Sequence, residues 1–294
     1  MLLNKNMKGV LVMEKEKITK LSLAATRIRK MALEGVYSAK AGHPGGSLSI
    51  ADILAYLYLE EMNINKDNFD SPDRNRFVLS KGHCAPALYG ALSEIGLIPK
   101  EDIKTLRHID SYLQGHPDMK GTDGVDMSTG SLGQGISAAN GMALVGKLYN
   151  KDYRVYTILG DGEIEEGQVW EAAMFAAHYK LDNLTAFVDF NGLQIDGDIT
   201  KVMNPTPIDE KFKAFGWNVI VIDAHDFNQI EDAVKAAKET KDKPTVIIAK
   251  SVKGKGVSFM ENQAKWHGSA PNQEQYETAI AELDEYIKTI GGEN

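Results

Sequence analysis

The residues best placed to do chemistry are an acid and an amide that follow two predicted strands. Asp161 lies in a Gly160–Asp161–Gly162 turn after the apolar run 155–159, and Asn191 follows the run 184–190. Because the carboxyl ends of parallel strands meet at one edge of a sheet, these two oxygen donors should lie close together. A hard cation such as Mg²⁺ prefers oxygen ligands and is often shared with phosphates, and the glycines let backbone N–H groups approach an anion. The pattern predicts a metal–diphosphate site.

Four of the seven histidines lie in loops that are rich in glycine and proline. They are His43, His83, His116 and His267. Imidazole donates and accepts protons near neutral pH, so four such loops predict a site that orients hydroxyl groups or moves protons. The other three, His108, His178 and His225, lie in helical or surface-like segments and are expected to be exposed or to have packing roles.

Other functions for these residues are less consistent with the spacing. A dinucleotide-binding turn would need its third glycine two positions before Gly167, and no acid is well placed to bind a ribose. A purely structural Asp-Gly turn would not explain the matching Asn191. No segment matches a P-loop, and neither H-E-x-x-H spacing nor a cysteine pair supports zinc. Cys84 is expected to be a small residue near the site rather than a nucleophile.

Composition limits the class of protein. The chain has 294 residues, 43% apolar and 25% charged, with a formal net charge of −8. This charge disfavours a nucleic-acid surface, and no apolar run reaches the roughly 18 residues that span a membrane. The N-terminus lacks the apolar core of a signal peptide, and a single cysteine suits a reducing compartment, so a cytoplasmic protein is expected. Without a repeat or linker, residues 1–294 are predicted to form one domain, with 1–14 as an N-terminal extension.

Predicted strands alternate with predicted helices along the chain. An amphipathic helix over 15–40 is followed by a helix that Ser47 or Ser49 could cap. The predicted strands are 76–80, 155–159, 184–190, 217–222 and 245–249, and further helices follow near 85–92, 138–148, 165–179, 229–238 and 273–290. This alternation predicts an α/β fold with a mostly parallel sheet.

Together these segments resemble the thiamine-diphosphate-binding N-terminal part of transketolase. That family's cofactor motif begins with Gly-Asp-Gly and ends with an asparagine after the next strand. The histidine loops occur in the family's order, and the loop 130–135 (Gly-Ser-Leu-Gly-Gln-Gly) also matches. The resemblance covers about residues 19–271. It implies the thiamine-diphosphate-binding fold, with a mostly parallel central sheet flanked by helices on both faces.

The resemblance also implies a role for each matching residue. Asp161, Asn191 and the main-chain carbonyl of Leu193 would hold Mg²⁺, or Ca²⁺ or Mn²⁺, on the diphosphate. The cofactor would further be bound by His83, Gly130, Leu132, Gly160, Gly162, Glu166 and His267. The catalytic residues would be His43, His83, His116 and His267, which would orient sugar hydroxyls and move protons. Glu166 and Glu171 would link two cofactor sites across a subunit interface.

In the full-length family, a pyrimidine-binding domain and a third domain follow this part. The resemblance therefore implies the N-terminal subunit of a split transketolase of the pentose phosphate pathway, acting on sugar phosphates. A separate C-terminal subunit would complete it, as a two-plus-two heterotetramer. Two alternatives remain. One is a subunit of a related synthase, of the dihydroxyacetone synthase or deoxyxylulose-phosphate synthase type, and the other is a non-catalytic thiamine-diphosphate-binding subunit.

Overall fold

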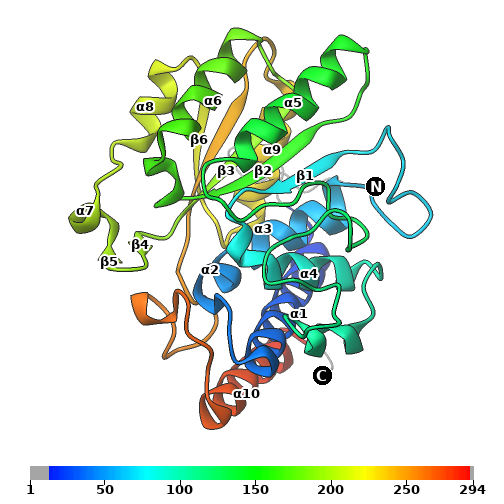
Figure 1. Cartoon of the computed structure of the whole chain (residues 1–294), viewed down its shortest axis with the longest axis vertical. Coiled ribbons are helices and arrows are strands. Elements are labelled where there is room, and N and C mark those ends of the chain that lie inside the picture. Colours follow the sequence, from blue (N-terminus) through cyan, green and yellow to red (C-terminus); the bar gives the residue numbers. More distant parts are fainter. Residues whose placement is uncertain (1–12, 292–294) are drawn as a thin grey trace.

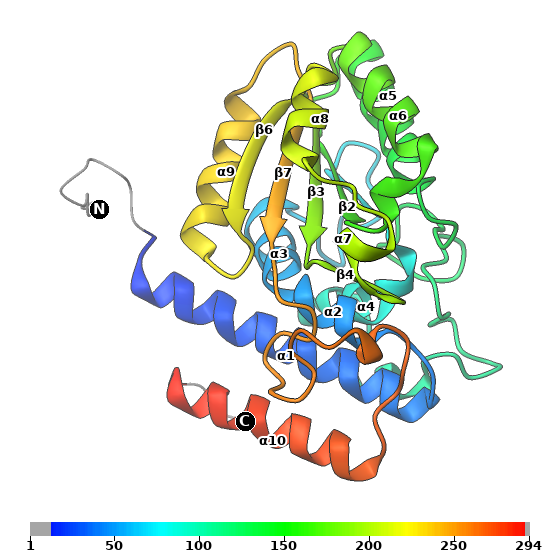
Figure 2. The same cartoon turned by 90° about the vertical axis from the view of Figure 1, so that its left-hand side faces the viewer.

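A five-stranded parallel sheet forms the centre of the computed structural model, which describes residues 13–291. Its order is β1-β2-β3-β7-β6, and every neighbouring pair in it is parallel. The strands are β1 (Arg76–Leu79), β2 (Val155–Gly160), β3 (Leu184–Phe190), β7 (Thr245–Lys250) and β6 (Asn218–Asp223). The carboxyl ends of β3, β7 and β6 point toward α2 (Pro44–Ser49) (Figures 1 and 2). The predicted α/β fold is confirmed.

Helices cover both faces of the sheet, and alternate strand residues contribute to the two cores. Tyr156, Ile158 and Phe187 face a cluster under α1, α3, α4 and α9. Leu159, Val188 and their neighbours face a second cluster under α5, α6 and α8. Strands buried on both faces need continuous apolar runs, which these β-branched sequences supply. The helices are α1 (Lys15–Ala39), α3 (Ala51–Tyr56), α4 (Ala85–Glu94), α9 (Phe227–Glu239), α5 (Gly135–Leu148), α6 (Gly167–His178) and α8 (Ile208–Ala214).

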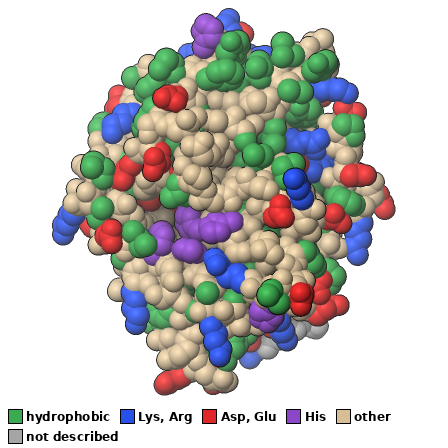
Figure 3. All heavy atoms as spheres, in the orientation of Figure 1, with side chains coloured by type: hydrophobic (Ala, Val, Ile, Leu, Met, Phe, Trp, Pro, Cys, Tyr) green, Lys and Arg blue, Asp and Glu red, His purple; other side chains and the backbone are tan. Residues whose placement is uncertain are grey.

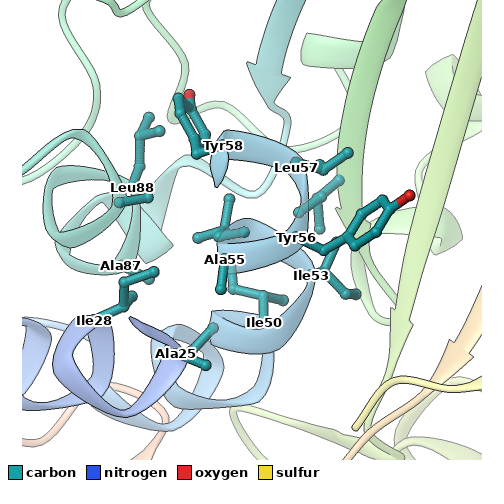
Figure 4. Packing of buried hydrophobic residues seen from close by; sticks show 14 of the residues in the cluster. Ala25, Ile28, Ile50, Ile53, Ala55, Tyr56, Leu57, Tyr58, Ala87 and Leu88 are labelled. Atoms are coloured by element: carbon teal, nitrogen blue, oxygen red, sulfur yellow. The ribbon is translucent and has the colours of Figure 1, made fainter. Parts of the chain in front are cut away.

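The long helix α1 lies across the end of the molecule below the sheet (Figure 2). Ala25 and Ile28 of α1 pack against Ile50 and Ala87 in the largest apolar cluster (Figure 4). The last helix, α10 (Gln273–Thr289), lies beside α1 and starts with a capping box at Asn272. The loop between β7 and α10 is held against these helices, because its residues Val257, Met260 and Trp266 share a third apolar cluster with Leu33 of α1 and Leu283 of α10.

Local structure departs from the sequence prediction in two places, and a third segment forms elements that the sequence pattern does not predict. Ser47 and Ser49 cap no helix, because α2 already starts at Pro44. The Ser47 hydroxyl donates to the carbonyl of His43, and the Ser49 hydroxyl lies within hydrogen-bond distance of Gly46 O and Asp189 Oδ2. The predicted helix at 165 is a 3₁₀ turn, η4 (Glu163–Glu165), followed by α6. Segment 193–214 forms short elements that lack a clear periodicity: β4 (Leu193–Gln194), β5 (Gly197–Asp198), α7 (Ile199–Val202) and α8.

The predicted N-terminal extension lies mostly outside the described residues, since 1–12 are not among them. Its end belongs to the fold: Met13 is buried, and its N–H donates to Asn228 Oδ1 at 2.9 Å. Within residues 13–291, no helix combines the length and apolar character that a membrane span requires.

Candidate functional site

A cavity of about 300 Å³ lies at the carboxyl edge of the sheet, beyond the ends of β2 and β3. Histidine side chains gather in a hollow of the surface on this face (Figure 3). The cavity is lined by most of the residues that the sequence singled out. They are His83, Leu132, Gly160, Asp161, Gly162, Glu166, Asn191, Leu193 and His267. The ends of parallel strands therefore bring together residues from five separate segments.

Asp161 is buried directly after β2, with its carboxylate held by main-chain donors. Its Oδ1 accepts from Gly162 N at 2.9 Å and its Oδ2 from Gly192 N at 2.6 Å. Burial, followed by the nearby carboxylate of Asp189, raises the pKa of Asp161 to about 7. A carboxylate held in this way gains from a cation placed beside it.

Asn191 and Leu193 add two oxygens to the same site. The Asn191 amide donates from Nδ2 to Asp189 Oδ2 at 3.0 Å, which fixes its orientation, and its Oδ1 accepts from Leu193 N at 3.1 Å. Within residues 13–291, no three His, Cys, Asp or Glu side chains are grouped to hold a metal. Carboxylate, amide and carbonyl oxygens are nevertheless the donor set that Mg²⁺ prefers, so these residues fit that ion.

Two buried lysines contribute the positive charge of the site. Lys81 Nζ donates to Asp189 Oδ2 at 2.6 Å and to Gly46 O at 2.9 Å. Burial acts to lower the pKa of Lys81, but Asp189 outweighs it and raises that pKa above its ordinary value. Lys253 Nζ donates to Leu193 O at 2.9 Å and lies 2.9 Å from His267 Nδ1. Burial, and then Lys81, lower the pKa of Lys253.

Three of the four predicted histidines form one cluster. The ring centroids of His43 and His83 are 5.0 Å apart, those of His83 and His267 5.2 Å, and those of His43 and His267 5.5 Å. Burial is the main reason that the pKa of His43 falls to about 4 and that of His267 to about 3, and it lowers the pKa of His83 as well. These imidazoles are neutral at pH 7. They can orient hydroxyl groups without adding charge.

His116 lies apart from this cluster, against the loop at Gly130. A Cβ atom on Gly130 would come within 3.2 Å of the His116 ring, so this position favours glycine. Burial, and then the guanidinium of Arg107, lower the pKa of His116. His116 contributes no lining to the main cavity.

The glutamates after the Gly-Asp-Gly turn have different surroundings. Glu166 lines the cavity but is exposed, and Glu171 is exposed on α6 outside it. Glu163, for which sequence reasoning assigned no role, is buried. Its carboxylate accepts from Gly133 N at 3.0 Å and from Gly160 N at 2.9 Å, and so joins the loop 130–135 to the end of β2.

Sequence reasoning missed Lys81, Glu163, Asp189 and Lys253. The signal for Asp189 was an acid inside an apolar strand, which requires a buried partner. Lys253 lies in a Gly/Lys loop with no such signal.

The single cysteine and the three other histidines, His108, His178 and His225, lie outside the main cavity. Cys84 is buried, and burial raises the pKa of its thiol, in keeping with a packing role. His108 and His178 are exposed, as expected. His225 instead makes two hydrogen bonds, to Asp52 and to the N–H of Val252.

A family profile described as "Transketolase, thiamine diphosphate binding domain" matches residues 20–284. A 6-deoxy-6-sulfo-D-fructose transketolase subunit of Clostridium sp. (strain MSTE9) is 48% identical over 261 residues, covering 88% of this chain and 94% of that protein. An apulose-4-phosphate transketolase subunit of Phocaeicola vulgatus is 42% identical over 274 residues, covering 93% and 97%.

A solved structure agrees with the sequence relatives. The transketolase of Campylobacter jejuni superposes with a TM-score of 0.83 at 33% identity, covering 94% of this chain and 43% of that one. The chain therefore spans nearly the whole of the two subunit relatives and less than half of the longer enzyme.

Proposed function

Because the chain belongs to the transketolase family, we propose that it is the cofactor-binding subunit of an enzyme that transfers a two-carbon ketol unit between ketose and aldose phosphates. The two subunit relatives, which match it along nearly their whole length, support this proposal. The single structural observation that carries it is the convergence of Asp161, Asn191 and Leu193 beside three neutral histidines.

The proposed cofactor is thiamine diphosphate, held through a divalent metal. Asp161 Oδ, Asn191 Oδ1 and the Leu193 carbonyl would hold Mg²⁺, with Ca²⁺ or Mn²⁺ as alternatives, and Lys253 would face the diphosphate. The oxygen donors and the buried ammonium support this assignment. When bound, thiamine diphosphate would supply the carbon centre that stabilises the carbanion of a two-carbon transfer.

The chain's own residues orient the sugar and handle protons. Lys253 Nζ–H donates to His267 Nδ1, so the second ring nitrogen, Nε2, carries the proton and can donate to a hydroxyl. Within residues 13–291, His43 Nδ1 is buried without a hydrogen-bond partner, and the His43 ring packs edge-on against those of His83 and His267. His83 contributes a third neutral ring, and His116 acts from the side of Gly130. Glu166 and Glu171 link two cofactor sites in the assembled enzyme.

The partner is a C-terminal subunit that holds the ring end of the cofactor, in a two-plus-two heterotetramer. An exposed apolar surface on α5 and α6 supports such assembly, since large apolar patches mark interaction sites. It is formed by Val145, Leu148, Tyr149, Met174, Phe175 and Tyr179. Leu132 and Ile195, on the rim of the cavity, are also exposed.

The substrates are sugar phosphates of the pentose phosphate pathway type. A 6-deoxy-6-sulfo ketose is a second candidate donor, which the name of the 48% identical relative favours. The remaining alternatives are a related synthase and a non-catalytic binding subunit. A related synthase would use the same metal–diphosphate site and the same histidine cluster. Profiling of donor and acceptor sugars therefore distinguishes it from a transketolase.

Reconstitution tests this proposal. The chain is mixed with the C-terminal subunit from the same organism, Mg²⁺ and thiamine diphosphate, and ketol transfer from xylulose 5-phosphate to ribose 5-phosphate is followed. We expect transfer by the mixture and none by either chain alone. Normal turnover by the isolated chain would refute the two-subunit proposal. Cofactor binding without transfer from any phosphorylated or sulfonated donor would favour the non-catalytic alternative.

A further inference from the structure

We propose that His225 is a positioning residue for the diphosphate end of the cofactor site. It is hydrogen-bonded between the Asp52 carboxylate and the backbone N–H of Val252, and it thereby fixes the loop that places Lys253. This inference rests on the proposed function, because it assigns to Lys253 a contact with the diphosphate.

The support for His225 begins in α3 and α1. Asp52 is buried, and the guanidinium of Arg29 binds both of its carboxylate oxygens. Arg29 Nε also donates to Leu48 O at 3.2 Å, so the guanidinium is itself held. Asp52 Oδ2 lies 2.7 Å from His225 Nδ1. A buried ion pair of fixed geometry therefore anchors one side of the imidazole.

The other side of the imidazole receives the loop. Val252 N–H donates to His225 Nε2 at 3.0 Å. An N–H group can only donate, so Nε2 carries no proton, and the proton of the neutral ring is on Nδ1, where it donates to Asp52. The carboxylate thus sets the tautomer, and the tautomer makes Nε2 an acceptor for the loop. Carboxylate–histidine pairs orient ligands in this way at many sites.

Lys253 follows Val252, and its position depends on how this loop is fixed. Gly254 and Gly256 have φ of 79° and 90°, so glycine here allows conformations that other residues rarely adopt. Ties to the surrounding structure compensate for this freedom. Ser251 Oγ donates to Asp189, Val252 N to His225, and Gly254 N to Gly45 O at 2.9 Å.

His225 ties the residue before Lys253 to the turn between β6 and α9, while Gly254, on the other side of Lys253, is tied to Gly45. The hydrogen bond to His225 helps to place the Lys253 ammonium beside Leu193 O and His267 Nδ1. Loss of this tie should leave the overall fold intact, because the Arg29–Asp52 pair remains. It should lower the affinity for the diphosphate instead.

Two substitutions separate the two hydrogen bonds of His225. His225→Asn places an amide near the Nδ1 position and keeps the Asp52 contact, but it does not reach Val252. His225→Gln places an amide oxygen near the Nε2 position and keeps the Val252 contact. His178→Asn is the control, because His178 is exposed at the far end of α6.

The assay is calorimetric titration of the full chain with inorganic pyrophosphate in excess Mg²⁺. We expect His225→Asn to bind pyrophosphate at least about tenfold more weakly, because loss of a residue that supports a metal site typically has an effect of this size. His225→Gln should stay within about threefold of the wild type. The control should bind unchanged. Hydrogen exchange should rise at the Val252 amide in His225→Asn and stay unchanged in the helices and strands.

The outcomes distinguish this inference from the proposed function. If the wild type does not bind pyrophosphate with Mg²⁺, the cofactor proposal itself is wrong. If the wild type binds and a folded His225→Asn binds equally well, the positioning role is overturned. Should His225→Asn fail to fold, His225→Gln decides. If hydrogen exchange at the Val252 amide of His225→Gln stays slow and this variant keeps its affinity for pyrophosphate, the positioning role is supported. If the exchange stays slow but the affinity is lost, the role is contradicted.

Discussion

Replacing Lys253 by methionine tests the electrostatics of the site most directly. Methionine keeps the length and apolar stem of lysine but removes the ammonium of a residue that is 2% exposed and donates to Leu193 O and His267 Nδ1. An ammonium has three N–H donors, so one remains for an anion in the cavity. A hydrogen bond to a charged group contributes about 2 kcal/mol, which corresponds to about thirtyfold in affinity.

We therefore expect Lys253→Met to bind magnesium–thiamine diphosphate about thirtyfold more weakly in calorimetry. Stability should change little. Burial lowers the pKa of Lys253, which means that the folded protein keeps this charge at a cost, and its removal offsets the lost donor to Leu193 O. The free energy of unfolding should stay within about 1 kcal/mol of the wild type.

The matched control is Lys255→Met, in the same loop, where the ammonium lies 3.5 Å from Glu261 at a partly exposed position. This variant should bind the cofactor normally. Wild-type affinity in Lys253→Met, or an equal loss in both variants, would refute the assignment of Lys253 to the diphosphate.

Three further predictions concern the metal, acid stability and backbone packing. Asp161→Ala should abolish Mg²⁺-dependent binding of thiamine diphosphate in calorimetry, and unchanged binding would exclude the metal assignment. Burial acts to raise the pKa of Asp52, but Arg29 outweighs it and lowers that pKa from 3.8 to about 2. The ionised form thus contributes stability that is present above about pH 4 and lost toward pH 2. Asp52→Asn should accordingly unfold about 2 kcal/mol more easily at pH 7 and vary less between pH 4 and 2 in denaturant titrations, and a parallel pH profile would contradict this. Gly135→Ala would place its Cβ atom 2.5 Å from the main chain after β1 and should destabilise the chain by about 1–3 kcal/mol. Gly141→Ala, with nothing within 4 Å, should instead stabilise helix α5 slightly, and similar melting temperatures for the two variants would disprove the packing argument.

The sheet and the convergence of the oxygen donors could be predicted from sequence because their signals are local. Strands buried on both faces must be apolar along their whole length, so the runs before Asp161 and Asn191 had few alternatives. Parallel topology then brings the two strand ends to one edge. The Gly- and Pro-rich loops around the histidines predicted one shared site, and the structure brings His43, His83 and His267 together while His116 lies apart.

The charges that support the site could not be found in this way. Lys81 and Asp189 are far apart in the sequence, and each buried charge is stabilised by its ion pair with the other. His225 carries no local sign of its function, because that function depends on an acid in α3 and on an N–H after β7. Ser47 shows a different limit: its type favours a helix cap, but Pro44 starts the helix one turn earlier.

The rim of the cavity, where Leu132 and Ile195 stay exposed, has a thermodynamic consequence for assembly. In the proposed assembly, one chain binds the charged end of the cofactor and a second chain covers its ring end. Such a ligand binds more tightly to the two chains together than to either chain alone. Linkage makes this relation reciprocal, so the ligand must strengthen association of the chains by the same factor. For the proposed two-subunit assembly, the dissociation constant of the subunits should therefore fall as the concentration of thiamine diphosphate rises, and depletion of the cofactor should weaken the assembly as well as empty the site.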